Sequence, residues 1–248
     1  MKNIFIALFL VLSLSCMENK KLLVIGHRGA MGHETENTIA SIEKALALEV
    51  NMIEIDVFKI ASGEIVVFHD DSVERLTNGK GNIEAFTLSE LRKLEVVGGH
   101  QIPLFTEVLN IINKKVPLNI ELKGANTAKD VDEIIKTYIS EKGWELNDFI
   151  ISSFNWDELI LMREVNNDIA VAVLIEDENP LEAIPLAKKL HAVAINPDAD
   201  KLTLEIANKI REAGFKIYPW TVNDPQKIIE MKRIGVDGMF TNYPERVK

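Results

Sequence analysis

Short runs of aliphatic and β-branched residues recur along the chain, and they predict buried β-strands. In the second half of the chain their starts lie 21, 21, 24 and 22 residues apart, the length that a strand, a crossover helix and two loops require. Polar and apolar residues alternate little within the runs, which is typical of parallel strands covered on both faces. Nine runs are present, at residues 22–26, 51–57, 64–68, 117–122, 149–153, 170–175, 191–195, 215–220 and 237–240.

The segments between these runs carry residues that begin and end helices. Asn37 is expected to cap the helix that follows it, and Asp224 precedes a proline at a first helical position. Gly214 suits the left-handed residue that ends a helix.

With the run at 64–68 assigned to a local hairpin, eight strands alternate with helices. This pattern predicts an α/β fold, a TIM (β/α)8 barrel, over residues 22–248; a doubly wound open sheet is the alternative. Residues 58–116 are too many for one crossover and predict a small insertion after the second strand, beside the mouth of the barrel.

The first 16 residues form a leader-like segment. Lys2 precedes an apolar run over residues 4–14, which is too short to span a bilayer and is typical of a signal peptide. The run is followed by Ser15 and Cys16, so residues 1–16 predict a lipoprotein leader with lipidation at Cys16 and an envelope protein anchored to the membrane. Cleavage by ordinary signal peptidase predicts a soluble periplasmic or secreted protein instead, and translation from Met17 predicts a cytoplasmic one.

Composition narrows the classes of partner. The net charge is −10 and the isoelectric point about 5.1, which argues against a general nucleic-acid binder. A site for a small phosphorylated molecule must therefore be made positive locally by Arg, Lys or a metal. Cys16 is the one cysteine in the sequence, which excludes an intrachain disulfide framework and a cysteine-rich zinc site.

Acidic side chains interrupt two of the apolar runs. Glu54 and Asp56 share a face of one predicted strand, and Glu121 shares a face with Lys123 at the end of another. Buried carboxylates require a cation, and three of them at adjacent strand ends suit a hard cation such as calcium or magnesium. Salt bridges to nearby basic side chains are the alternative interpretation.

Two histidines stand at the ends of predicted strands beside these acids. His27 and His69 titrate near neutral pH, which suits general acid–base catalysis. Arg28 can bind phosphate oxygens with two nitrogens. The other histidines, His33 among them, lack acidic partners at a useful spacing and are expected to be structural. Asp70 is expected to serve a turn or a supporting role, since it points away from His69 along a strand.

Nine motifs occur in order: HRG (27–29), ENT (36–38), EIDV (54–57), VVFHD (66–70), IPLFTEVL (102–109), NIELK (119–123), SSFN (152–155), PWTVND (219–224) and VDGMFTNYP (236–244). Together they resemble the glycerophosphodiester phosphodiesterase family from residue 22 to the C-terminus. The resemblance implies a divalent metal, usually calcium or magnesium, and hydrolysis of glycerophosphodiesters to sn-glycerol 3-phosphate and an alcohol. The roles it implies are catalysis for His27 and His69, metal binding for Glu54, Asp56 and Glu121, and substrate binding for Arg28, Lys123, Phe154 and Trp220.

The sequence departs from the family pattern at Thr35, where a proline is usual, and in the turn at residues 59–63. Neither position carries an assigned role. Three alternatives remain open: an inactive barrel that binds phosphodiesters, a phospholipase D-type enzyme acting on lysophospholipids, and a metal hydrolase of non-phosphate substrates. Phe58, Phe68 and Phe86 form either an apolar rim at the mouth, which would favour lysophospholipids, or the core of the insertion.

Overall fold

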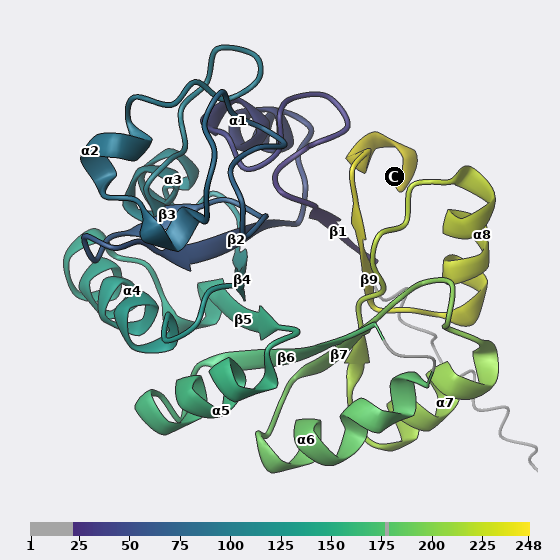
Figure 1. Ribbon diagram of the computed structural model, residues 1–248. Coiled ribbons are helices and arrows are strands. Elements are labelled where there is room, and N and C mark those ends of the chain that lie inside the picture. The colour runs from purple at the N-terminus through teal and green to yellow at the C-terminus, as the bar shows by residue number, and fades with distance from the viewer. Residues whose placement is uncertain (1–21, 177–178) are drawn as a thin grey trace, which may run out of the picture.

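The apolar runs form a ring of parallel strands in the computed structural model, which describes residues 22–176 and 179–248 (Figure 1). The ring order is β8-β7-β6-β5-β4-β2-β1-β9, so the TIM-barrel prediction is confirmed. The leader and Cys16 lie outside the described residues. The strands are β1 (Leu23–Gly26), β2 (Met52–Lys59), β4 (Leu118–Leu122), β5 (Phe149–Ser153), β6 (Ala170–Ile175), β7 (Ala194–Pro197), β8 (Lys216–Ile217) and β9 (Gly238–Thr241).

The ring closes between β8 and β9 through backbone bonds and one side chain. The backbone N–H of Asp237 donates to the carbonyl of Ile217 at 3.0 Å. In return, the N–H of Ile217 donates to the Asp237 carboxylate at 2.9 Å rather than to a carbonyl oxygen. β8 is shorter than the predicted run at 215–220, because Pro219 has no N–H to offer a neighbouring strand.

Helices cover the outside of the ring (Figure 1). Their apolar faces pack on the outward-facing side chains of the strands and form the largest core of the protein. The helices around the ring are α1 (Ile39–Ala47), α3 (Phe105–Ile112), α4 (Ala128–Lys142), α5 (Trp156–Val165), α6 (Ile184–Lys189), α7 (Leu204–Glu212) and α8 (Pro225–Ile234).

Inward-facing side chains fill the ring in layers. A buried apolar layer includes Ile25, Met52 and Phe240, which come from three different strands. Successive side chains on a strand point to opposite faces, so the next inward-facing residue lies two positions further on. After Ile25 that residue is His27, and after Met52 it is Glu54. The polar layer therefore stands directly on an apolar one, at the carboxyl ends of the strands.

The insertion has its own small core. Strand β3 (Ile65–Val67) pairs antiparallel with β2, and helix α2 (Leu88–Leu91) follows it. Phe58 and Phe68 are buried in this second core, and Phe86 packs against it half-buried. These rings therefore form the core of the insertion and not an apolar rim at the mouth.

Two of the three predicted helix ends are as expected. The Asp224 carboxylate accepts from the N–H groups of Gln226 and Lys227 at the start of α8, and Gly214 is left-handed after α7, with φ of 96°. The prediction for Asn37 is wrong, since Thr38 caps α1 and Asn37 itself is left-handed, with φ of 56°. Within the described ranges, none of the helices is both long enough and apolar enough to cross a membrane.

Candidate active site

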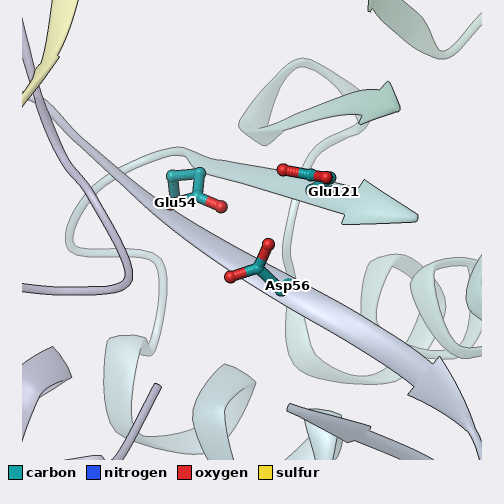
Figure 2. Close-up of side chains that lie close together, drawn as sticks. All are labelled: Glu54, Asp56 and Glu121. Carbon is teal, nitrogen blue, oxygen red and sulfur yellow. The ribbon is translucent and has the colours of Figure 1, made fainter. Parts of the chain in front are cut away.

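Three carboxylates meet at the carboxyl ends of β2 and β4. Asp56 stands opposite Glu121 in the parallel register, and Glu54 is one inward-facing position before Asp56. One oxygen from each of the three lies within 4.8 Å of the others, and Figure 2 shows the carboxyl groups directed toward a common space. Their exposed fractions are only 2%, 1% and 8% for Glu54, Asp56 and Glu121.

Neighbouring cations satisfy part of this acidic group. The Arg28 guanidinium lies 3.4 Å from Asp56, and the Lys123 ammonium lies 3.2 Å from Glu121. Glu54 accepts from the Arg28 backbone N–H at 2.8 Å with one oxygen. Its other oxygen is buried and has no hydrogen-bond partner among the described residues. Arg28 Nε and Glu121 Oε1, which take part in the two ion pairs, are also buried without a hydrogen-bond partner among these residues. Salt bridges alone therefore leave the acidic group incompletely satisfied.

Burial and mutual repulsion make Glu54 and Glu121 weak acids. Burial, followed by the charge of Asp56, raises the pKa of Glu121 to about 8. The same two causes, with the charge of Glu121, raise the pKa of Glu54 well above its usual value. A divalent cation would remove the repulsion and occupy the unpartnered oxygen of Glu54. The all-oxygen donor set fits a hard cation.

His27 lies just after β1, next to the acidic group. Its Nδ1 is 2.7 Å from the side-chain oxygen of Asn242. Because an amide oxygen only accepts, Nδ1 carries the proton and Nε2 keeps its lone pair. Burial, and then the charge of Arg28, lowers the pKa of His27 to about 4. The imidazole is therefore neutral at pH 7 and able to accept a proton.

His69 comes from the insertion side of the site. Its Nδ1 donates to Asp70 at 2.7 Å, and its Nε2 accepts from the Lys123 ammonium at 3.3 Å. These two contacts fix the tautomer of the ring. The supporting role expected for Asp70 is thus to hold the side chain of its own neighbour. The expectation that His33 lacks an acidic partner is wrong, since its Nε2 lies 3.0 Å from Glu245, a residue distant in sequence.

The loop after β1 is shaped by backbone that turns sharply. Arg28 has a φ of 50° and Gly29 a φ of 84°. A Cβ on Gly29 would lie 2.4 Å from the Ser41 hydroxyl, so a side chain at this position would clash with α1. This close approach brings the Arg28 N–H to Glu54 and directs the Arg28 side chain across the acidic group.

A network of alternating charges surrounds this loop, and it could not be assembled from the motifs alone. The Glu36 carboxylate accepts from Arg28 at 2.6 Å and from Arg75 at 2.8 and 3.0 Å. Arg75 also binds Asp70. Asn37, expected only as a helix cap, instead donates to Asp56 at 2.8 Å. The ENT motif marks Glu36 and Asn37 in the sequence, but nothing in the sequence indicates that Glu36 contacts Arg75.

A cavity of about 400 Å³ opens above the acidic group. Phe154, which is 37% exposed, and Trp220 meet edge to face at one side of it, with ring centroids 5.1 Å apart. Asp56 does not line the cavity, but its carboxylate contacts Arg28, which does. The predicted site residues that line the cavity are His27, Arg28, Glu54, His69, Glu121, Lys123, Phe154 and Trp220, and lining residues that sequence reasoning missed include Asn119, Ser152 and Glu176.

Comparison with known proteins agrees with this geometry. The sequence profile of the glycerophosphoryl diester phosphodiesterase family matches residues 27–246. The chain belongs to this family. A glycerophosphodiester phosphodiesterase from Caldanaerobacter subterraneus subsp. tengcongensis is 34% identical over 234 residues, which are 91% of this chain and 96% of that protein.

Solved structures of the family share the fold. The structure of an Oleispira antarctica phosphodiesterase in complex with the product sn-glycerol-3-phosphate matches with a TM-score of 0.82 at 26% identity, over 91% of this chain and 94% of that one. A glycerophosphodiester phosphodiesterase from Thermotoga maritima matches with a TM-score of 0.74 at 28% identity, over 91% and 96%. The family resemblance drawn from the nine motifs is confirmed.

Proposed function

We propose that this protein is a metal-dependent phosphodiesterase that hydrolyses glycerophosphodiesters to sn-glycerol 3-phosphate and an alcohol. The observation that carries the proposal is a group of three buried carboxylates, two of which line a cavity together with two histidines of fixed tautomer. Family membership supplies the reaction class.

Glu54, Asp56 and Glu121 would hold the metal, and calcium or magnesium is the cation that such oxygen donors prefer. The unpartnered buried oxygen of Glu54 and the raised pKa of Glu121 support this assignment. When bound, such a cation supplies positive charge for phosphate oxygens and makes a nearby hydroxyl more acidic.

The remaining side chains bind the substrate and move protons. Arg28 and Lys123 present positive charge to the phosphate group from opposite sides of the carboxylates. His27 and His69 divide two proton transfers: one imidazole takes the proton of the attacking oxygen, and the other gives a proton to the leaving alcohol. Phe154 and Trp220 offer apolar faces to the carbon chain of the diester.

An assay for release of sn-glycerol 3-phosphate from a panel of glycerophosphodiesters tests the proposal. Activity is expected to disappear in EDTA and to return with calcium or magnesium. Lysophosphatidylcholine belongs in the panel as the probe for lysophospholipase D activity. Binding of diesters without turnover in any metal would establish the inactive binding barrel, and full activity of the metal-free protein would contradict the metal site.

We propose further that the protein is anchored to the bacterial envelope through Cys16. The support is the leader sequence itself, with Lys2, the apolar run and Ser15 before the cysteine. Cell fractionation of the wild type and Cys16→Ser, with mass spectrometry of the mature N-terminus, tests it. A lipid-modified Cys16 in the membrane fraction is expected, whereas a soluble protein with unmodified Cys16, or one that begins at Met17, would contradict the anchor.

A further inference from the structure

Arg75 stands between two carboxylates on the two sides of the site. It belongs to the insertion, five residues after Asp70. Its guanidinium binds Asp70 through Nε and Nη2 at 2.5 and 2.9 Å. It binds Glu36, in the loop that joins β1 to α1, through Nη1 and Nη2 at 3.0 and 2.8 Å. One side chain thus makes two bidentate pairs, the strongest geometry available to arginine.

Each of these carboxylates holds a residue of the candidate active site. Asp70 accepts the Nδ1 proton of His69 at 2.7 Å, and Glu36 accepts from Arg28 at 2.6 Å. The five side chains form one chain of contacts in the order His69, Asp70, Arg75, Glu36, Arg28. Because the Arg75 side chain is 48% exposed, it does not need the two carboxylates to compensate for burial of its charge.

The two ends of this chain come from different parts of the fold. Arg28 follows β1 in the barrel, whereas His69 and Asp70 follow β3 within the insertion, many of whose apolar residues pack in a core of their own. Backbone bonds from Gly29 and Phe68 to β2 anchor both segments, but they do not orient the side chains of Arg28 and His69 relative to each other. Arg75 supplies a polar link across this boundary.

We propose that Arg75 is a positioning residue, which sets His69 and Arg28 at the separation that phosphodiester hydrolysis requires without touching the substrate. This inference rests on the proposed function for its readout in catalysis. Misplacement of reacting groups by about 1 Å can cost roughly 10²-fold in rate. Both carboxylates are held in the ionised form that the chain requires: although burial acts the other way, the arginines lower the pKa of Glu36 to about 2, and Arg75 with His69 lowers that of Asp70 to about 2.

The kinetic test compares Arg75→Ala and Arg75→Lys with Arg92→Ala. Arg92 is the matched control, because it too belongs to the insertion and binds a carboxylate, that of Glu107 at 2.7 Å, away from the cavity. Arg75→Ala is expected to lower kcat by roughly 10- to 100-fold with a smaller change in KM. Arg75→Lys, which binds only as a point charge, should fall between this variant and the wild type, and Arg92→Ala should stay within about twofold of wild type.

Chemical rescue separates positioning from folding. Millimolar guanidinium is expected to restore part of the kcat of Arg75→Ala and to leave Arg92→Ala unchanged, while the melting temperatures of both variants stay near that of wild type. Wild-type kcat in Arg75→Ala would overturn the proposal. So would a loss of activity that only tracks a loss of folded protein and does not respond to guanidinium.

A readout independent of turnover is the set of His69 imidazole signals, followed by ¹⁵N NMR. Asp70 and Lys123 should keep the Nδ1-protonated form in both proteins. The wild type should show one set of His69 signals, and Arg75→Ala should show broadened or split signals from more than one ring position, with the His27 signals unchanged. Unchanged His69 signals in Arg75→Ala would overturn the inference even if the kcat of the variant falls. If the wild type hydrolyses no diester, the proposed function fails on that result alone, and the NMR comparison still decides whether Arg75 positions His69.

Discussion

Replacing one titratable carboxyl of the acidic group by an amide should stabilise the metal-free protein while weakening its response to metal. The substitution is Glu121→Gln, which keeps the shape of the side chain and cannot ionise. In the metal-free wild type, burial and the charge of Asp56 raise the pKa of Glu121 to about 8, from an ordinary value of 4.5. A carboxyl group with a raised pKa binds its proton more tightly in the folded state, so stability present below pH 4.5 is lost as pH rises toward 8.

The size of the effect follows from the two pKa values. At pH 7 the loss is 2.303RT multiplied by the 2.5 units between pH 7 and 4.5, or on the order of 3 kcal/mol. At pH 5.5 it is only about 1 kcal/mol by the same relation. Glu121 is 8% exposed, so solvent screening reduces these figures little. Glu121→Gln escapes the loss, and in EDTA at pH 7 its melting temperature should exceed that of the wild type by about 6–12 °C.

With metal bound, the wild type should become the more stable of the two proteins. A cation at 100 times its dissociation constant stabilises the folded state by about 2.7 kcal/mol, and Glu121→Gln lacks one of the three proposed ligands. The assay is thermal unfolding in EDTA, calcium and magnesium, each at pH 5.5, 7 and 8. The result expected is a large metal-induced rise for the wild type and a small one for the variant.

Glu158→Gln is the matched control. Glu158 is as buried as the acids of the site, but it accepts from the N–H groups of Thr127 and Ala128 at the start of α4. Replacing this carboxylate should therefore destabilise the protein in all three buffers and leave the metal response intact. If Glu121→Gln were no more stable than wild type in EDTA, or responded to metal as strongly, the account of the acidic group would be refuted.

Two further predictions concern catalysis and the loop after β1. His27→Ala and His69→Ala should each lower kcat by roughly 10²–10⁴-fold. His33→Ala should stay near wild type in the same assay, because the His33 ring contacts Glu245 and Tyr243 and does not line the cavity; equal sensitivity of His33 would overturn the assignment. Gly29→Ala should destabilise the protein by about 2 kcal/mol or more in urea unfolding, because a Cβ there would lie 2.4 Å from the Ser41 hydroxyl at a φ of 84°. If Gly29→Ala were as stable as the wild type, α1 would be able to move away from the added Cβ without a loss in the free energy of unfolding, and the reasoning would be wrong.

Much of the barrel was predictable because its strands are buried on both faces, which leaves continuous apolar runs in the sequence. The first or last residue of two strands was harder to predict. The predicted run at 191–195 begins before its strand, since His191 is left-handed, with φ of 48°, and belongs to the preceding turn. The run at 215–220 extends beyond the end of β8, because Pro219 has no N–H to donate to a neighbouring strand.

Some residues of the candidate site were likewise predictable from the sequence and others were not. The carboxylates were predictable because acids are costly inside apolar strands, and strand periodicity puts Glu54 and Asp56 on one face. The role of Asn37 was not predictable, since a polar residue before a helix is typical of a cap, and only the fold brings its amide to Asp56. Arg75 was missed for a related reason: 39 residues separate it from Glu36, and no local pattern records their contact.

The closure of the ring by Asp237 bears on how such a barrel can change over generations. Along the other boundaries of the ring, neighbouring strands are joined by N–H and carbonyl groups that nearly every residue possesses, so substitutions there leave the joins in place. Between β8 and β9, backbone bonds from Asp237 and Phe240 also join the chain segments, but the Ile217 N–H depends on a carboxylate, which a single substitution would remove. That one bond is therefore open to selection in a way that the backbone bonds of the ring are not.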